Sequence, residues 1–189
     1  MLKPAISMKI KLKTCRECGV KFTPFKPLQS VCSPLCAINK VNKNKLKIQK
    51  EAYKIEKERI KTRSDWIKEV QTIFNKYIRL RDKEYECISC DKPATWDGQW
   101  HASHFYATSI RPNLRFNENN VHKACSVCNN YMHGNLTPYR EKLILKIGIE
   151  EMNILDNAKT PAKYTIQDLK ELKAHYAKIT KELTGKMQD

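Results

Sequence analysis

The sequence lacks any long apolar segment. No stretch approaches the roughly 18 consecutive apolar residues of a membrane-spanning helix, so we expect none. The first residues, MLKPAISMKIKLK, contain neither a continuous apolar core nor a small-residue cleavage site, which argues against a secretory signal peptide. We therefore expect a cytoplasmic protein, in a reducing compartment where structural disulfides are rare.

Acidic residues are few relative to basic ones. The 189 residues include 20 Asp and Glu against 36 Lys and Arg, which gives a formal net charge of +16. The shortage is concentrated in residues 1–64, which hold 17 Lys and Arg but only 4 Asp and Glu, whereas residues 65–189 hold 19 and 16. A basic arm on a nearly balanced body indicates a polyanionic partner, nucleic acid before membrane.

Cysteine, in contrast, is abundant and occurs in two quartets. In each quartet, two turns carry two thiols each, three or four residues apart, which is the spacing of a tetrahedral zinc site. Because closed four-cysteine sites leave no open coordination position, we expect two structural Zn²⁺ ions that take no part in catalysis. Ligands could be exchanged between the quartets, but the local turns favour two sequential sites. The quartets are Cys15, Cys18, Cys32 and Cys36, and Cys87, Cys90, Cys125 and Cys128.

A long basic helix is predicted directly after the first quartet. The quartet itself brackets GVKFTPFKPLQSVCSP, whose prolines argue against a helix there. In residues 37–61 the apolar positions recur every 3.5 residues, which is typical of a helix with a weak seam. The seam consists of Ile38, Val41, Ile48, Ala52 and Ile55, with Lys45 and Arg59 at intervening and following positions. This helix could pack on the body, pair with a second copy in a homodimer, or lie along DNA.

The remaining elements predict a mainly helical α+β fold. A helix at 65–81 is expected after Ser64 as N-cap, another at 138–147, and a last one after Thr165, with Asp168 in a capping-box position. A loop is expected between the helix at 138–147 and the last helix. Residues 84–135 are predicted to form short strands, a loop and one short helix. The predicted domains are a zinc-knuckle module at 1–37, a basic helical arm at 38–83, a core with the second four-cysteine zinc site at 84–137 and C-terminal helices at 138–189.

The segment around the second quartet is dense in His and Asn. It reads HASHFYATSIRPNLRFNENNVHKACSVCNNYMHGN, with His104 at the end of a strand-like stretch, Asn120 in the middle and Asn129 directly after the last cysteine. This order resembles the HNH (ββα-metal) endonucleases, and particularly the phage enzymes that resolve Holliday junctions. Together with CRECGVKFTPFKPLQSVCSPLC and the basic helix, residues 15–135 resemble the NinG (Rap) family of phage recombination proteins.

The resemblance implies a structure-specific DNA endonuclease of phage recombination, which cleaves Holliday junctions and D-loops by metal-dependent phosphodiester hydrolysis. It implies His104 as general base, Asn129 as ligand of a catalytic Mg²⁺ or Mn²⁺, and Asn120 as the residue that braces the loop and orients the imidazole. A neutral imidazole can take a proton from water at neutral pH. A neutral amide ligand suits Mg²⁺, which keeps several of its waters.

The second protein ligand of this ion is left open, because Ser103 stands where many HNH relatives have a metal-binding Asp. His101 is one candidate, since it shares the strand face of Ser103. His133 is another, four residues after Asn129 on the same helix face, and Asp97 is a third. We expect His122 to be a surface or DNA-contacting residue rather than a metal ligand. Other predicted DNA contacts are Arg111, Arg115, Lys43, Lys45, Lys47, Lys50 and Lys54.

Two other functions remain compatible with the sequence. One is a non-catalytic zinc-containing DNA-binding protein in recombination, which the Ser103 departure favours. The other is a structural or assembly protein whose basic arm packages nucleic acid. A nuclease would lose cleavage when His104 is replaced by alanine, whereas a pure binding protein would lose nothing measurable.

Overall fold

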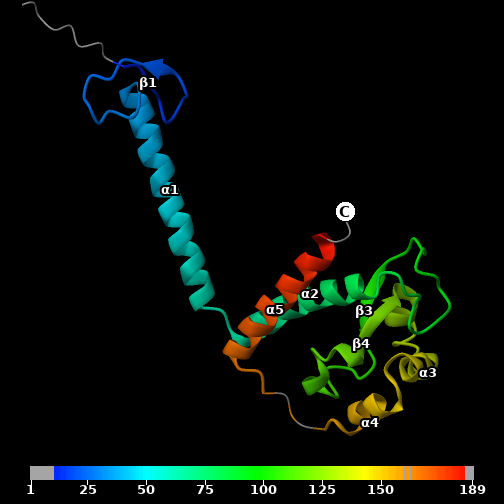
Figure 1. The fold of residues 1–189 in the computed structure, drawn as a ribbon. Coiled ribbons are helices and arrows are strands. Elements are labelled where there is room, and N and C mark those ends of the chain that lie inside the picture. The colour runs from blue at the N-terminus through cyan, green and yellow to red at the C-terminus, as the bar shows by residue number, and fades with distance from the viewer. Residues whose placement is uncertain (1–10, 160, 162, 186–189) are drawn as a thin grey trace, which may run out of the picture. The chain divides into compact units, whose positions relative to one another are not determined.

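The computed structural model describes residues 11–159, 161 and 163–185. It is mainly helical with two small two-stranded sheets (Figure 1), which confirms the α+β class. The chain divides into two compact units, residues 1–60 and 61–189, so the predicted boundaries after residues 37 and 83 fall inside units. Residues 1–10, which make up most of the segment that argues against a signal peptide, lie outside the described residues. Among the described helices, none combines the length and apolarity that crossing a membrane requires.

The first unit is a small sheet joined to one long helix. Strand β1 (Lys13–Thr14) pairs antiparallel with β2 (Lys21–Phe22), and α1 spans Pro34–Arg59. Ser33 caps α1 by accepting a hydrogen bond from the Cys36 amide. The helix starts three residues before its predicted beginning, because a proline is tolerated in the first turn, where its missing N–H has no helical partner. Only Cys36 of α1 is buried, so the helix draws almost no stability from packing.

In the second unit, helices α2 (Arg63–Arg81) and α5 (Ile166–Gly185) pack against each other around an aromatic cluster. The Phe74 ring meets Tyr176 edge-on at 4.8 Å between centroids and Phe116 at 5.7 Å. Thr62, not Ser64, caps α2, and it forms a capping box with Asp65. The predicted capping box of α5 is confirmed, because Thr165 and Asp168 exchange side-chain hydrogen bonds with each other's amides.

The second sheet leads into a single helical turn. Strand β3 (Trp100–His104) pairs antiparallel with β4 (Val121–Cys125), which sets His104 opposite Val121. The connection contains the short helices η1 (Pro112–Leu114) and η2 (Glu118–Asn120), and the π-helical turn η3 (Val127–Tyr131) follows β4. The short strands, the loop and the short helix expected in residues 84–135 are therefore all present.

Two further helices pack against the turns that carry the second cysteine quartet. Helix α3 spans Leu136–Ile147 and α4 spans Ile149–Asn157, so the loop predicted after residue 147 is wrong. Gly148 adopts a positive φ of 86° and redirects the chain between the two helices. Met152 and Leu155 of α4 are then buried in the core beside the second cysteine quartet. This burial depends on tertiary packing, which the local sequence does not reveal.

Candidate functional site

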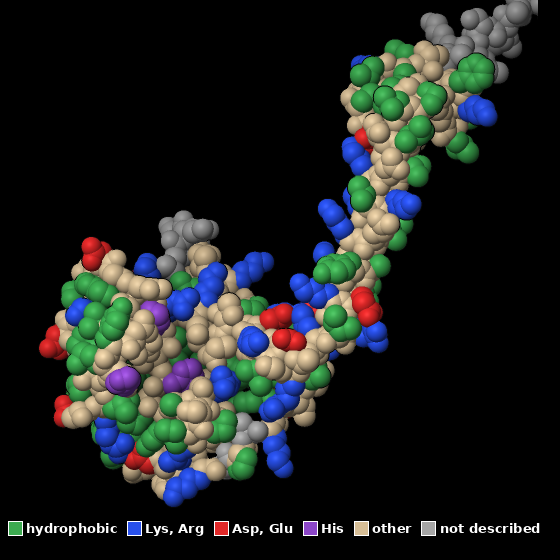
Figure 2. All heavy atoms as spheres, turned by 180° about the vertical axis from the view of Figure 1, so that it is seen from behind, with side chains coloured by type: hydrophobic (Ala, Val, Ile, Leu, Met, Phe, Trp, Pro, Cys, Tyr) green, Lys and Arg blue, Asp and Glu red, His purple; other side chains and the backbone are tan. Residues whose placement is uncertain are grey.

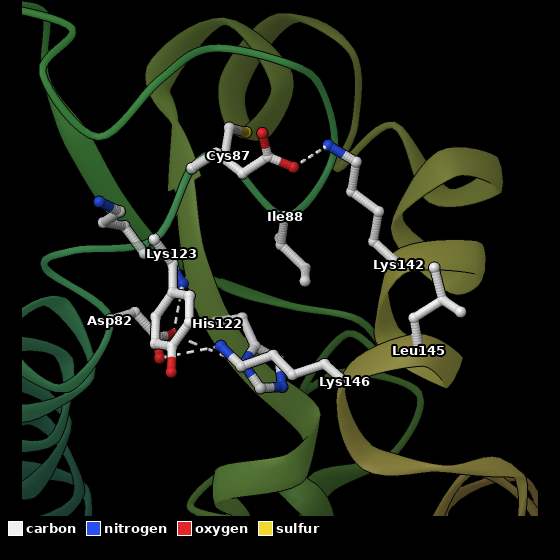
Figure 3. Close-up of a pocket in the computed structure, with 10 residues that line it drawn as sticks. Asp82, Cys87, Ile88, His122, Lys123, Lys142, Leu145 and Lys146 are labelled. Atoms are coloured by element: carbon white, nitrogen blue, oxygen red, sulfur yellow. Dashed lines mark hydrogen bonds and ion pairs between the residues drawn. The ribbon is translucent and has the colours of Figure 1, made fainter.

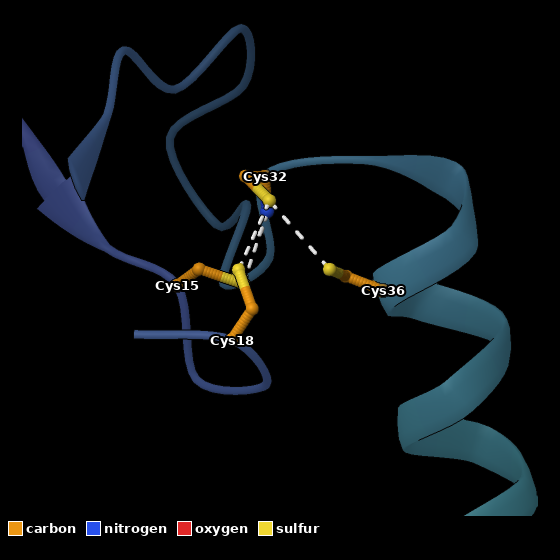
Figure 4. Close-up of side chains that lie close together, drawn as sticks. All are labelled: Cys15, Cys18, Cys32 and Cys36. Atoms are coloured by element: carbon orange, nitrogen blue, oxygen red, sulfur yellow. Dashed lines mark hydrogen bonds between the residues drawn. The ribbon is translucent and has the colours of Figure 1, made fainter. Parts of the chain in front are cut away.

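The first cysteine quartet converges on one point (Figure 4). Its four sulfurs lie within 4.8 Å of one another. The Sγ–Sγ distances are 3.5 Å from Cys18 to Cys32 and 3.6 Å from Cys32 to Cys36, close to the roughly 3.8 Å edge of a tetrahedron of sulfurs about 2.3 Å from zinc. Backbone N–H groups, led by that of Cys18, lower the pKa of Cys15 to about 6. The donor set fits a zinc ion that would fasten the β1–β2 module to α1.

The second quartet has the same form but is more deeply buried. Cys90 and Cys125 lie 3.8 Å apart between sulfurs, and Cys87, Cys125 and Cys128 are buried. The Cys125 amide donates to the Cys87 sulfur at 3.2 Å, and the Cys128 amide donates to the Cys125 sulfur at 3.4 Å. These four thiols also fit zinc, which would join the end of β4 to the 87–90 turn and to η3. No other group of three or more Cys, His, Asp or Glu ligands converges among the described residues.

His104 lies at the end of β3 with one ring nitrogen engaged. Its Nε2 lies 2.9 Å from the backbone carbonyl oxygen of Arg115. Since a carbonyl only accepts, the proton of the neutral ring is on Nε2 and the lone pair is on Nδ1. Nδ1 has no hydrogen-bond partner in the described part of the chain and is not among its buried, unsatisfied atoms, so solvent reaches it. Burial lowers the pKa of His104 below its ordinary value of 6.5, which keeps the ring neutral at neutral pH.

Asn120 is fully buried and holds the loop that carries Arg115. Its Oδ1 accepts from the Tyr106 amide at 2.8 Å, and its Nδ2 donates to the carbonyls of Tyr106 and Leu114, both at 3.1 Å. One side chain therefore ties the two ends of the 106–114 segment together. Because the His104 ring contacts the carbonyl one residue beyond this clamp, Asn120 fixes the partner that orients the imidazole.

Of the predicted ligands of the catalytic ion, His101, His133 and Asp97 belong to no group of three or more Cys, His, Asp or Glu side chains that converges in the described part of the chain. Asn129 lies in η3, where its side-chain Nδ2 donates to the side-chain Oδ1 of Asn130 at 2.9 Å. His133 is exposed with a left-handed φ of 49°, so the prediction that it shares a helix face with Asn129 is wrong, because the helical turn ends at Tyr131. His101 lies on β3 with a buried, unpartnered Nε2. Asp97 lies exposed before β3.

The arginines predicted to bind DNA make contacts inside the protein. Arg111 donates to the carbonyls of Ala158 and Asp156 at the end of α4, at 2.8 and 3.1 Å. Arg115 donates to the Gln71 side chain at 3.3 Å. On α1, Lys43 pairs with Glu17, and Lys54 lies 3.6 Å from Glu51. Lys45, Lys47 and Lys50 are exposed. Of the predicted lysine contacts, these three form no ion pair with another described residue.

A buried polar cluster around Asp82 was not anticipated (Figure 3). Asp82 lies 3.0 Å from Lys146 and accepts from the Lys123 amide at 3.1 Å, as Figure 3 shows. It also lies 2.8 Å from Arg81. His122 is 2% exposed, so the expectation that it contacts DNA at the surface is wrong. Its Nδ1 lies 2.9 Å from the Arg81 guanidinium, an obligate donor. Sequence gave no signal for this cluster, because Asp82 follows α2 and meets β4 and α3 only in the folded unit.

Comparison with known proteins shows to which family the chain belongs. The family model of the bacteriophage lambda NinG protein matches residues 7–186. The chain belongs to the NinG family. The protein ninG of Escherichia phage lambda is 43% identical over 121 residues, which cover 64% of this chain and 58% of the relative. NinG of Escherichia phage 933W is 39% identical over 141 residues, or 75% and 66% of the two chains. That of Salmonella phage P22 is 41% identical over 121 residues, or 64% and 59%.

The resemblance to the NinG family stated from the motifs is therefore confirmed, and the family match includes both quartets and His104. The matched part of this chain spans about three fifths to two thirds of the curated NinG relatives. No solved structure matches the chain.

Proposed function

We propose that this NinG-family chain is a structure-specific DNA endonuclease of phage recombination, which acts in the host cytoplasm on branched DNA such as Holliday junctions and D-loops. Its core would be of the HNH, or ββα-metal, type. The observation that carries the proposal is the His104 imidazole, half-buried and neutral, with Nε2 held by the Arg115 carbonyl and Nδ1 reached by solvent. A ring fixed in this tautomer is prepared to accept a proton.

In the proposed reaction, a water molecule attacks the scissile phosphorus while Nδ1 of His104 takes its proton. The bond between phosphorus and the 3′ oxygen breaks, the leaving oxygen takes a proton from solvent water to form a hydroxyl, and the charge of the imidazolium is stabilised by the Arg115 carbonyl at Nε2. Mg²⁺ or Mn²⁺, when bound, would stabilise negative charge at the phosphate and the leaving oxygen. Asn129 is the residue proposed to hold this ion, since a hard cation prefers oxygen ligands and retains water. His101 stays a predicted second ligand.

The test is a nicking assay on a four-way junction and on linear duplex, with and without Mg²⁺ or Mn²⁺. We expect metal-dependent nicking that is faster on the junction. His104→Ala should reduce the rate by about 10²- to 10⁴-fold, the usual contribution of a general base, while zinc content and DNA affinity are retained. His175→Ala, which changes an exposed histidine on α5, is the matched control. Nicking by His104→Ala at the wild-type rate would refute the proposal.

A non-catalytic zinc-containing DNA-binding protein in recombination is the second candidate. Ser103 favours it, because this residue is 2% exposed and stands where the HNH pattern has a carboxylate ligand. A protein of this kind would bind junctions in a salt-sensitive manner without nicking them under any metal condition. The same assay therefore separates the two candidates.

We also propose that α1 joins two copies of the chain. Its apolar seam residues are exposed, Ile38 by 57%, Val41 by 63%, Ile48 by 70% and Ile55 by 64%. With Ile38 as position a of a heptad, the flanking e and g positions hold Ala, Asn, Gln and Glu but no lysine. Six lysines occupy positions c and f on the far side instead, namely Lys40, Lys43, Lys47, Lys50, Lys54 and Lys57. This separation suits a seam that pairs with protein and a far face that meets phosphates.

A further inference from the structure

Two large apolar side chains are presented to solvent at the tip of the N-terminal module. Phe25 is 93% exposed and Leu28 is 96% exposed, the highest values among the large hydrophobic residues described. Both belong to residues 24–29, called here the knuckle loop. Single exposed hydrophobic residues are common on protein surfaces. Two adjacent ones that lose almost no surface on folding contribute nothing to a core, which points to a role in binding.

The knuckle loop is fixed rather than loosely displayed. The Phe25 amide donates to Gln29 Oε1 at 2.6 Å, and Gln29 Nε2 donates to the Val31 carbonyl at 2.9 Å. The Lys13 ammonium donates to the Pro27 carbonyl from β1. Pro24 and Pro27 further restrict the backbone. Because the loop is already ordered, an apolar contact made by its tip costs little additional conformational entropy.

The surroundings of the loop carry positive charge. Figure 2 shows exposed hydrophobic side chains over this module, with a few basic side chains at its edges. In residues 11–32 the one acidic residue, Glu17, is paired with Lys43. The basic residues of the same segment are Lys11, Lys13, Arg16, Lys21 and Lys26. The partner must therefore combine negative charge with an apolar face.

We propose that the knuckle loop is a wedge for nucleic acid whose base stack is open. Phe25 stacks on an unpaired or unstacked base, Leu28 contacts the neighbouring base or sugar, and the surrounding lysines contact phosphates. Nucleic acid offers aromatic faces and phosphates together, and aromatic stacking on exposed bases is independent of sequence. We therefore expect the knuckle loop to bind DNA at branch points and single-stranded gaps.

The wedge deepens the proposed nuclease function, and it rests on that function for the choice of a branched substrate. Counterion release caused by α1 favours branched and linear DNA equally, because it depends on the phosphates alone. In intact duplex, the apolar pair enters only after a base step is unstacked, which costs a few kcal/mol, whereas a branch point already offers open steps. The loop therefore supplies a physical basis for preferring branched DNA over linear duplex.

The experiment uses the full-length, zinc-loaded protein without added Mg²⁺, so that binding is measured apart from cleavage. A four-way junction carries 2-aminopurine at the branch, and the matched linear duplex carries it at the same sequence position. The Phe25→Ala/Leu28→Ala double variant should lose about 10-fold in junction affinity, within the roughly 5- to 150-fold typical of aromatic–base stacking. Its duplex affinity should be unchanged, and the 2-aminopurine response should disappear.

The control is Leu12→Ala/Leu35→Ala, which removes two exposed leucines outside the knuckle loop and should change neither affinity. Two zinc ions per chain in each variant show that folding is retained, and Phe25→Trp should restore junction binding. An unchanged ratio of junction to duplex affinity in the double variant would overturn the wedge. Phe25-dependent binding to vesicles of phosphatidylserine and phosphatidylcholine, with junction affinity unaltered, would assign the loop to a membrane and overturn it as well.

Failure of the wedge and failure of the nuclease proposal give different results. Loss of branch preference in the double variant, combined with no nicking in Mg²⁺ by the wild type, removes the nuclease and leaves the wedge. Nicking by the wild type, combined with an unaltered affinity ratio in the double variant, does the opposite.

Discussion

At the residue scale, the burial of the His104 imidazole predicts the pH range in which the proposed hydrolysis is possible. Its pKa is lowered by burial, while the hydrogen bond to the Arg115 carbonyl acts in the opposite direction. A general base works only when neutral, so the nicking rate should be full above pH 6.5 and should fall as the pH drops through a lower value. Rates measured on a four-way junction between about pH 5 and 8 test this. An acid limb centred above 6.5 would contradict it.

The negative charge of Asp82 is expected to stabilise the second unit. Burial alone would raise its pKa, but the hydrogen bonds and positive charges of Arg81 and Lys146 outweigh this and hold the pKa far below the ordinary value. A carboxylate with a depressed folded pKa stabilises the fold above its unfolded pKa of about 4, and this contribution is lost as the pH falls below it. Asp82→Asn should therefore destabilise the second unit by about 3 kcal/mol at neutral pH, because buried cations lose their partner.

Urea unfolding followed by circular dichroism measures this change. Asp91→Asn is the control, since the Asp91 side chain is 97% exposed and its loss should cost little. Below about pH 4 the difference between wild type and Asp82→Asn should shrink. Equal midpoints at neutral pH would mean that the cluster in Figure 3 carries no net stabilisation.

At the element scale, the exposed seam of α1 predicts self-association. Isolated helices are marginal in water without a packed face, and Cys36 is the one buried residue of α1. Ile48→Lys should dissociate the dimer by placing a charge in the seam. Leu46→Lys adds the same charge to a residue that is 55% exposed and outside the seam, and it should leave the dimer intact. Light scattering on both variants measures the mass, and a monomeric wild type would contradict the prediction.

The elements that could be predicted are those specified by local patterns. The two cysteine quartets, the extent of α2 and the capping box at Thr165 follow from spacing and capping chemistry. Helix α4 could not be predicted, since its burial depends on the second quartet, which it meets only after folding. His122 was misplaced for the same reason. Its partners Arg81 and Asp82 lie about forty residues away in the sequence.

The candidate site was likewise predictable in its residue types but not in its contacts. Motif order placed His104 at the end of a strand and Asn120 before the next one. The carbonyl of Arg115 as the partner of the imidazole could not be foreseen, because a backbone oxygen leaves no trace in the sequence. The helix assumed to join Asn129 with His133 stops after one turn, since the backbone turns left-handed at His133.

At the scale of the whole molecule, the net charge of +16 predicts strongly salt-dependent DNA binding. If about six phosphates are neutralised, the slope of log K against log salt should be near −5. Replacing Lys47 and Lys50, on the far side of α1 from the seam, by Gln should reduce its magnitude by about 2, because each phosphate contact contributes about 0.9. Affinities on duplex at several salt concentrations test this. An unchanged slope would show that α1 does not contact DNA.

The unequal depth of the two cysteine quartets has a chemical consequence for the life of the protein. Cys18 is exposed, whereas three of the four sulfurs in the other quartet are buried. Peroxides and electrophiles react first with accessible thiolates, so oxidative damage would begin in the N-terminal module. A mildly oxidised molecule would release one metal equivalent and keep the second unit folded, so the proposed nuclease core would outlast the proposed DNA-binding module of the first unit.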